Sequence, residues 1–483
     1  MDSRYKRLGK NSALVFIGGA GSKLIGFIML PFYTHYMSTS EYGASDLVFT
    51  YSAILVGFVS CCIADAIFIF PKDCDEEGRK KYYTSGFLFA ASTFIGCFLL
   101  FILLSFLNKS HLISGTIFDM IWWLFAFAAS EFFQNYTQQF TRSIDKMMVY
   151  SISGIVLTLS MALLAFLLLP SFGLRGYLMS MVCAKFIAGI FAIVASNSYK
   201  YFSISSFDLK YLRNLLSYGI PLIPNGIMWW MVNGVNRPIM ESSLGLSAIG
   251  LFSVAGKFPS VLNMLFSIFA NAWFISLIEE FKKPDFNQFF NKTIKVLFFV
   301  TIIGGCFIGV FSKLLIRVFA APEYFDAWKY MPLLTLGVIL EALSGLVGGV
   351  FAAEKKSKYF FYSSLWGAAV SLLLTWPFIK LFGLVGASLA VSASFLCMFI
   401  VRLIFAWKYI NLFDVKYFLF VFVGYISFIA VVYQDLGVLI NIVSFLVVLL
   451  FICFLSKKEI HSITIKFNGY IKKYCCPIKI GID

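Results

Sequence analysis

Apolar stretches of about 20 residues recur from one end of this chain to the other, and they restrict its fold more than any other feature. Each stretch is long enough to cross the hydrocarbon core of a bilayer as a helix, in which every backbone hydrogen bond is satisfied internally. The composition agrees, because 60% of the 483 residues are hydrophobic and only 13% are charged. The sequence therefore predicts an all-α polytopic membrane protein.

Fourteen of these stretches are predicted to be transmembrane helices. In chain order they cover residues 11–36, 43–70, 83–107, 116–139, 149–169, 174–196, 215–240, 248–277, 292–319, 330–352, 359–380, 384–408, 416–433 and 437–456. An even number of spans places the two termini on the same side of the membrane.

Lysine and arginine accumulate in alternate connecting segments, which predicts the orientation of the chain. The segments assigned to the outer side contain only Lys109, Arg175, Lys329 and Lys380. Because cytoplasmic loops are rich in lysine and arginine, both termini of this multi-pass membrane protein are predicted to be cytoplasmic. The net charge of +15 is then explained by topology, and nucleic-acid binding is not expected.

An internal repeat divides the chain. Residues 172–176 read Phe-Gly-Leu-Arg-Gly and residues 382–386 read Phe-Gly-Leu-Val-Gly, while Ser-Glu-Tyr-Gly at 40–43 returns as Ser-Ala-Ile-Gly at 247–250. The basic loop before Tyr150 likewise has a counterpart before Tyr362. Duplication of a six-span unit predicts two lobes related by a pseudo-two-fold axis along the membrane normal, with a cavity between them.

The predicted domains follow from the repeat. They are an N-terminal lobe at 1–200, a cytoplasmic linker at 201–213, a C-terminal lobe at 214–410, two extra helices within 411–456 and a basic cytoplasmic tail at 457–483.

Four of the cations inside predicted spans are taken as candidate site residues, because a charge at the centre of a span costs roughly 3 kcal/mol on insertion scales. They are Lys23, Lys185, Arg237 and Lys257. Close helix packing does not require a cation, so Lys23 and Lys257 are interpreted as lining a water-filled cavity that binds substrate. Arg237 and Lys185 are candidate helpers, and for Lys185 a structural ion pair is an equal alternative.

Spans 7 and 8 each carry a stripe of polar residues at helical spacing. The members are Asn225, Asn233, Asn236, Ser253, Ser260, Ser267 and Asn271. Such stripes either let helices pack closely or face a cavity, and we interpret these as cavity-lining. Pro221 and Pro224 are expected to bend span 7.

Carboxylates also occur inside predicted spans, at Asp46, Asp65, Glu131 and Glu341. Each is a candidate either for an ion pair with a buried cation or for proton coupling during transport. The polar run that begins at Glu131 and ends at Gln139 is expected to line the inner mouth of the cavity.

Sequence signatures of catalysis are not found. The Gly256-Lys257 pair lacks the other residues of a phosphate-binding loop, the cysteines show no CxxC spacing, and the three histidines are scattered. No enzymatic activity, metal or cofactor is therefore expected, and the predicted mechanism is binding followed by movement.

Several landmarks resemble bacterial O-antigen and capsular-polysaccharide flippases. They are Lys10-Asn11 with Gly21-Ser22-Lys23, Leu30-Pro31-Phe32-Tyr33-Thr34, Ser40-Glu41-Tyr42-Gly43, the run from Leu215 to Pro224, Gly250-Leu251-Phe252-Ser253, and Glu323-Tyr324-Phe325-Asp326-Ala327-Trp328. The resemblance covers nearly the whole chain.

This resemblance implies the fold of the multidrug/oligosaccharidyl-lipid/polysaccharide exporter superfamily and transport by alternating access. The implied cargo is an undecaprenyl-diphosphate-linked oligosaccharide, with membrane lipid, a polysaccharide polymerase and a chain-length regulator as partners. In this reading Lys23 and Lys257 hold the diphosphate. The alternatives are a multidrug and toxin exporter of the same fold, a lipid-linked peptidoglycan precursor flippase, or a glycan polymerase or ligase, which usually has a larger outer loop.

Overall fold

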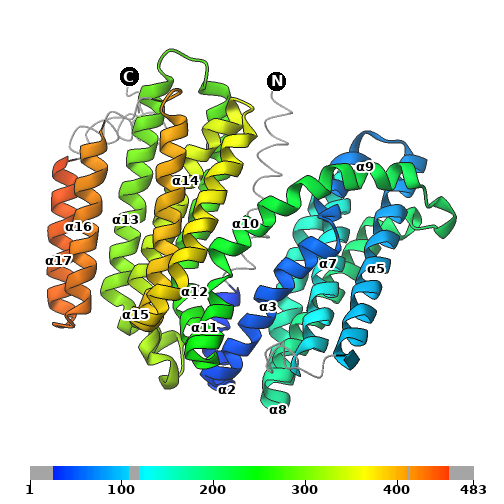
Figure 1. Cartoon of the computed structure of the whole chain (residues 1–483), viewed down its shortest axis with the longest axis horizontal. Coiled ribbons are helices and arrows are strands. Elements are labelled where there is room, and N and C mark those ends of the chain that lie inside the picture. The colour runs from blue at the N-terminus through cyan, green and yellow to red at the C-terminus, as the bar shows by residue number, and fades with distance from the viewer. Residues whose placement is uncertain (1–24, 108–118, 411–413, 456–483) are drawn as a thin grey trace, which may run out of the picture. The chain divides into compact units, whose positions relative to one another are not determined.

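Helices form every regular element in the part of the chain that the structure describes (Figure 1). The structure is a computed structural model, and it describes residues 25–107, 119–410 and 414–455. The first half of the chain contains α2 (Leu30–Tyr36), α3 (Thr39–Val59), α4 (Ile63–Ile69), η1 (Phe70–Asp73), α5 (Glu76–Leu107), α7 (Ile121–Ser143), α8 (Met147–Ser196), η2 (Ser198–Tyr201), η3 (Ile204–Ser206), α9 (Leu209–Gly219), η4 (Ile220–Leu222) and α10 (Ile223–Asn233). The second half contains α11 (Asn236–Leu244), α12 (Leu246–Glu280), α13 (Phe286–Phe319), η5 (Pro322–Lys329), α14 (Met331–Ala353), α15 (Ser357–Ala406), α16 (Val415–Tyr433) and α17 (Val438–Leu455).

These helices match the predicted spans segment by segment. Nine helices in the described ranges are long and apolar enough to cross a membrane, and two of them, α8 and α15, each cover two predicted spans. Predicted span 4 corresponds to α7, and span 7 corresponds to the series from α9 to α11. Most of span 1 lies outside the described residues. The all-α polytopic fold class is therefore confirmed.

The duplicated glycine motif forms the same sharp turn in both copies. Gly173 inside α8 has φ 52° and ψ −134°, and Gly383 inside α15 has φ 59° and ψ −135°. This left-handed backbone strongly favours glycine, which has no Cβ. Each turn separates two predicted spans, so α8 and α15 are both pairs of antiparallel helices. The predicted repeat is thus present in the backbone geometry.

A second pair of repeat glycines meets at a helix crossing. A Cβ on Gly43 of α3 would lie 2.0 Å from the Leu246 carbonyl oxygen, and a Cβ on Gly250 of α12 would lie 1.9 Å from the Thr39 carbonyl oxygen. The crossing is reciprocal, because each glycine faces the first residue of the other helix. Only residues without a side chain permit this approach of two backbones.

The described contacts divide the chain into two compact units. Unit 1 comprises residues 1–257, 316–330 and 364–394, and unit 2 comprises residues 258–315, 331–363 and 395–483. Both Asp46 and Lys257 belong to unit 1, whereas Glu341 belongs to unit 2. The predicted lobe and linker boundaries stay a prediction.

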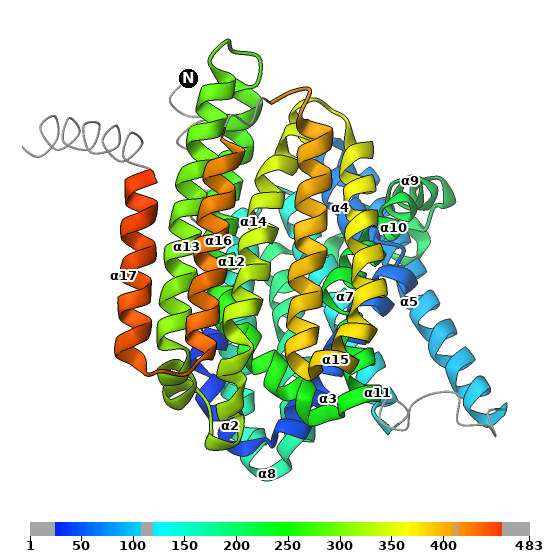
Figure 2. The same ribbon diagram turned by 60° about the vertical axis from the view of Figure 1, so that its left-hand side comes forward.

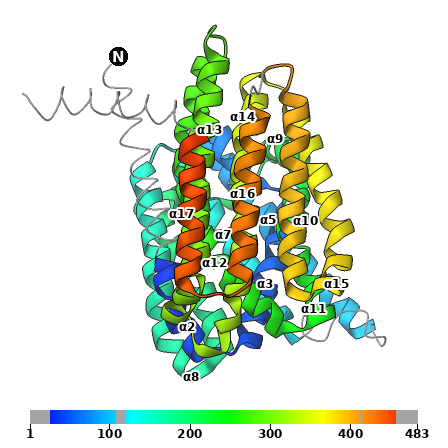
Figure 3. The ribbon, with the colours of Figure 1, turned by 90° about the vertical axis from the view of Figure 1, so that its left-hand side faces the viewer.

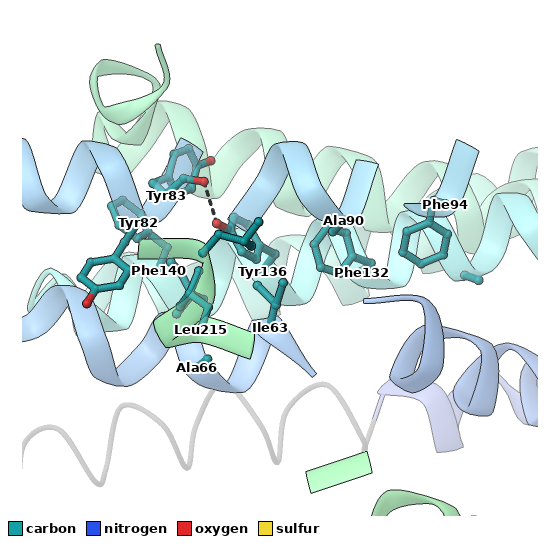
Figure 4. Close-up of a cluster of buried hydrophobic side chains, with 13 residues drawn as sticks. Ile63, Ala66, Tyr82, Tyr83, Ala90, Phe94, Phe132, Tyr136, Phe140 and Leu215 are labelled. Carbon is teal, nitrogen blue, oxygen red and sulfur yellow. Dashed lines mark hydrogen bonds between the residues drawn. The ribbon is translucent and has the colours of Figure 1, made fainter. Parts of the chain in front are cut away.

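The core of unit 1 contains an aromatic cluster where α4, α5, α7 and α9 meet (Figure 4). Tyr83, Tyr136 and Phe140 are buried there, and the Tyr136 hydroxyl donates a 2.7 Å hydrogen bond to the Tyr83 carbonyl oxygen. This bond satisfies a polar group that would otherwise be costly in an apolar core. The cluster fixes α4 after the backbone turn at Cys61 and Cys62, both of which have left-handed φ values of 49° and 52°.

Unit 2 ends with two adjacent helices. α16 and α17 pack side by side and are joined by a short turn that contains Gly437 at φ 103° (Figure 2). The same neighbouring arrangement is seen from the side in Figure 3. These are the two extra helices that follow the duplicated spans in the sequence.

Candidate functional site

An ion pair inside predicted spans joins α3 and α11 in unit 1. The Arg237 Nε–H donates to Asp46 Oδ2 at 3.1 Å, and the two side chains are 19% and 23% exposed. Arg237 also donates to Asn236 Oδ1 at 2.8 Å and to the Asn233 carbonyl oxygen. Because both charges are largely removed from solvent, their interaction is screened less than a surface pair.

Lys257 of α12 adds a second cation to this ion pair. Its ammonium donates a hydrogen bond to the Tyr42 hydroxyl, and it interacts electrostatically with Asp46 and with Arg237. The Arg237 guanidinium lies over the Phe252 ring, 5.1 Å from its centroid, which ties α11 to α12. Two cations therefore share one carboxylate. We call Tyr42, Asp46, Arg237 and Lys257 the cationic cluster, and its excess positive charge suits an anion.

A break in span 7 positions Arg237. α10 ends at Asn233, and α11 begins at Asn236, after Gly234, whose Cβ would lie 2.9 Å from the Trp230 Nε1. The Trp230 indole N–H donates a 2.7 Å hydrogen bond to the Thr50 carbonyl oxygen of α3. This bond holds α10 against α3 and so places the start of α11 beside Asp46. The predicted bend near Pro221 is also present, as the 3-10 turn η4.

A cavity of about 340 Å³ lies between α3 and α10, next to the cationic cluster. Arg237 and Asn233 are at one end of its lining, and Cys62 and Ile223 are at the other. The walls between them are mainly apolar. The cavity and the cluster together form the candidate binding site of unit 1.

Lys185 and Glu131 pair with each other across α7 and α8. The Lys185 ammonium contacts Glu131 Oε2 and lies over the Phe127 ring, 4.7 Å from its centroid. Of the two roles predicted for Lys185, the structure therefore shows the ion pair. Its role as a cavity cation stays a prediction.

Part of the polar run after Glu131 is packed between helices. Gln134, Thr137 and Gln138 are at most 8% exposed, and Gln138 Nε2 donates to Ser153 Oγ at 2.8 Å. Their polar groups are satisfied within α7 and against α8. Packing between helices therefore accounts for these three residues, and the place of the whole run at the inner mouth of the cavity stays a prediction.

Removing either member of the Lys185–Glu131 pair is expected to lower stability by about 1 kcal/mol, because the pair is partly exposed and solvent compensates in part. The double variant Lys185→Met with Glu131→Gln is expected to lose no more free energy of unfolding than either single variant. A double-mutant cycle of thermal unfolding in detergent measures this coupling. Simple addition of the two losses would show that the residues act independently.

Glu341 lies in unit 2 and accepts a 3.0 Å hydrogen bond from Asn263 Nδ2. Its carboxylate also interacts electrostatically with Arg402, a fully buried residue that the sequence analysis did not select. Arg402 donates to Ser363 Oγ at 3.0 Å and to the Ser344 carbonyl oxygen at 2.8 Å. Glu341 therefore has an opposite charge nearby. This agrees with the ion pair, one of the two roles predicted for it.

The remaining predicted residues occupy varied surroundings. Asn236 and Ser253 are buried, Asn225 and Ser267 are half-buried, and Asp65, Ser260 and Asn271 are exposed. The Ser253 hydroxyl and the Asn236 amide nitrogen have no hydrogen-bond partner within the described ranges. The structure thus does not bring the whole stripe of span 8 to one environment. Lys23 lies outside the described residues.

Tyr42, Trp230 and Arg402 are the functional candidates that sequence reasoning missed. Tyr42 precedes Asp46 by four residues, so its place on the same helical face was readable. Arg402 falls within the predicted span at 384–408 and was not selected with the other cations. Trp230 had no sequence signal, because its role depends on the Thr50 carbonyl of another helix. No group of three or more histidine, cysteine or acidic residues that might hold a metal occurs among the residues with described positions.

The family model described as polysaccharide biosynthesis protein matches residues 8–274. No curated protein sequence matches the chain.

Several solved structures share the fold. The lipid II flippase MurJ in an inward closed conformation has a TM-score of 0.68 at 16% identity, over 93% of this chain and 100% of its own. An inward-facing multidrug resistance MATE family transporter of the MOP superfamily has a TM-score of 0.63 at 13% identity, over 83% of this chain and 93% of its own. A MOP superfamily transporter from Pyrococcus furiosus has a TM-score of 0.56 at 12% identity, over 82% of this chain and 94% of its own. These likenesses show the fold, the two-lobe architecture of that superfamily.

Proposed function

The chain belongs to the polysaccharide biosynthesis protein family, and on that premise we propose that it is a flippase for a lipid-linked oligosaccharide. The proposed cargo is an undecaprenyl-diphosphate-linked repeat unit of O-antigen or capsule, moved from the cytoplasmic to the periplasmic leaflet. The proposed location is the bacterial inner membrane, with both termini in the cytoplasm. A polymerase and a chain-length regulator would act on the product.

The observation that carries this proposal is the cationic cluster. Arg237 and Lys257 lie within predicted membrane spans, and both interact with the carboxylate of Asp46. A diphosphate brings two or more negative charges into a region of low dielectric, where fixed cations offset the loss of hydration. An anionic headgroup therefore completes the charge balance of this cluster, with Lys23 as a further predicted ligand.

Transport follows from the same contacts. A bound diphosphate competes with Asp46 for Arg237 and with Tyr42 for Lys257, so binding changes the contacts that join α3, α11 and α12. A ligand shifts a conformational equilibrium only through such differential contacts. Alternating access then requires movement of helices and no covalent step. Proton coupling through Glu131 or Glu341 stays a prediction.

A multidrug exporter of the same fold is the second candidate. Its cationic substrates favour a site with excess negative charge, whereas the cationic cluster has two cations to one carboxylate. The cluster chemistry therefore supports the anionic lipid.

Lys257→Ala and Arg237→Ala are expected to reduce surface glycan in a flippase-null strain by about tenfold to a hundredfold, because a charge-assisted hydrogen bond contributes about 1.5–3 kcal/mol. Lys23→Ala is expected to have a similar effect. Lys313→Ala is the control, since Lys313 pairs with Asp435 in unit 2, outside the cluster. Glycan is measured by gel and protein level by immunoblot. Full glycan from Lys257→Ala and Arg237→Ala at normal protein level would contradict the proposal.

A further inference from the structure

The cavity between α3 and α10 has a charged end and an apolar remainder. Its lining is Thr50, Ala53, Ile54, Gly57, Phe58, Cys62, Ile223, Gly226, Ile227, Trp230, Asn233, Gly234 and Arg237. From Thr50 to Phe58 along α3 it extends roughly 12 Å, at 1.5 Å per helical residue, and it continues to Cys62 beyond the end of α3. Arg237 is the charged residue of this lining, and it lies at the Thr50 end, where it pairs with Asp46.

The apolar part of the cavity is open space and not packed side chains. Gly57 of α3 and Gly226 of α10 both belong to the lining, and a Cβ at either position would meet no atom within 4 Å. By contrast, Gly43 on the same α3 helix faces a carbonyl oxygen at 2.0 Å. The two lining glycines therefore widen the cavity, whereas Gly43 serves close packing.

The volume indicates what kind of ligand fits. At about 340 Å³ the cavity is at the lower end of the range for small-molecule sites. It has room for a segment of one slender chain but not for the paired acyl chains of a phospholipid. The Trp230 ring and aliphatic side chains supply apolar walls, and Arg237 supplies a site for an anion at one end.

We propose that this cavity holds the first isoprenoid units of a polyprenyl diphosphate, with the phosphate at Arg237. The inference rests on the proposed function and deepens it, because it assigns a protein site to the lipid chain as well as to the headgroup. Arg237 at one end of the cavity matches the diphosphate of such an amphiphile. The apolar walls along the rest of the cavity match its hydrocarbon chain. The ligand replaces Asp46 as the partner of Arg237.

The direction of the cavity bears on the mechanism. In the predicted orientation α3 begins at the outer side, so the Arg237 end is nearer the outer side and the Cys62 end nearer the cytoplasm. A lipid bound in this way has its diphosphate outward and its chain inward, which is its orientation in the outer leaflet. The cavity therefore holds the cargo after the headgroup has turned over.

The test uses geranylgeranyl diphosphate with a diazirine on its chain, added to the full-length protein in nanodiscs. Photolabelling followed by peptide mapping is expected to mark α3 and α10 around Gly57 and Gly226. Gly57→Leu and Gly226→Leu each place a side chain in the cavity and are expected to lower labelling about tenfold. Gly96→Leu in α5 is the matched control, because a Cβ at Gly96 also meets nothing within 4 Å and Gly96 is not in the lining.

Competition separates the sources of the ligand. Excess inorganic pyrophosphate is expected to reduce labelling of the parent protein, because it occupies Arg237. If phosphatidylglycerol competes and pyrophosphate does not, the cavity is a phospholipid site and the proposal is overturned. Equal labelling of Gly57→Leu, Gly226→Leu and the parent, at equal thermal stability, would also overturn it.

The failure of this inference is distinct from failure of the proposed function. Full labelling and full surface glycan in both Gly57→Leu and Gly226→Leu, with glycan lost in Lys257→Ala, would remove the chain site and leave the flippase proposal intact. Normal glycan in Lys257→Ala and Arg237→Ala would remove the flippase proposal itself.

Discussion

Arg402→Ala is expected to destabilise the protein by about 3–5 kcal/mol, the cost of removing one partner from a buried ionic network. Arg402 is 1% exposed, its guanidinium bonds Ser363 and Ser344, and it lies 4.2 Å from the centre of the Phe360 ring. Alanine leaves a cavity and removes the opposite charge near Glu341. The expected result is a lower midpoint of thermal unfolding and less protein in the membrane.

Two comparisons identify the cause. Arg317→Ala is the control, because Arg317 is exposed on α13. This substitution is expected to change the free energy of unfolding by no more than about 0.5 kcal/mol. Arg402→Met combined with Glu341→Gln is expected to recover part of the loss, since it removes both charges and keeps an apolar volume. An Arg402→Ala protein as stable as the parent would refute a structural role for this network.

Gly250→Val is expected to lower the free energy of unfolding by about 3 kcal/mol or more, because a clash with a backbone atom cannot be relieved by rotating a side chain. The added Cβ would lie 1.9 Å from the Thr39 carbonyl oxygen, so α3 and α12 must separate. These helices carry Asp46 and Lys257, and their separation also disrupts the cationic cluster. Stability and surface glycan are therefore expected to fall together.

Gly256→Val is the matched control for this change. Gly256 lies on the same helix, and a Cβ there meets nothing within 4 Å, so the expected change is within about 0.5 kcal/mol. Thermal unfolding of the two variants in the same detergent gives the comparison. Equal stability of Gly250→Val and Gly256→Val would contradict the reciprocal crossing.

The repeat shows how far sequence reasoning extended. The interval of 210 residues between Gly173 and Gly383 was readable as a motif, and both glycines form the same turn. The same interval separates Glu131 from Glu341, which the sequence analysis did not notice. In the structure each of these carboxylates has a cation nearby, Lys185 and Arg402 respectively. A search for repeated charges would have related the two glutamates.

The charged members of the candidate site could be predicted from the sequence, whereas their pairing could not. Asp46, Arg237 and Lys257 were selected because charges inside apolar spans require a reason. Lys185 was selected on the same ground, yet it pairs with Glu131 on neighbouring helices of unit 1. The sequences of the spans alone do not distinguish Arg237 and Lys257 from Lys185, because each cation is surrounded by similar residues along its own helix.

Segment length, apolar content and the placement of lysine and arginine are properties of local sequence. They determined the membrane class, the number of spans and the predicted orientation without reference to any contact. Which carboxylate neutralises which cation, and where open volume remains beside Gly57 and Gly226, depends on the approach of helices far apart in the chain. Those distances depend on packing between helices, such as the crossing at Gly43 and Gly250, and only the tertiary structure decides them.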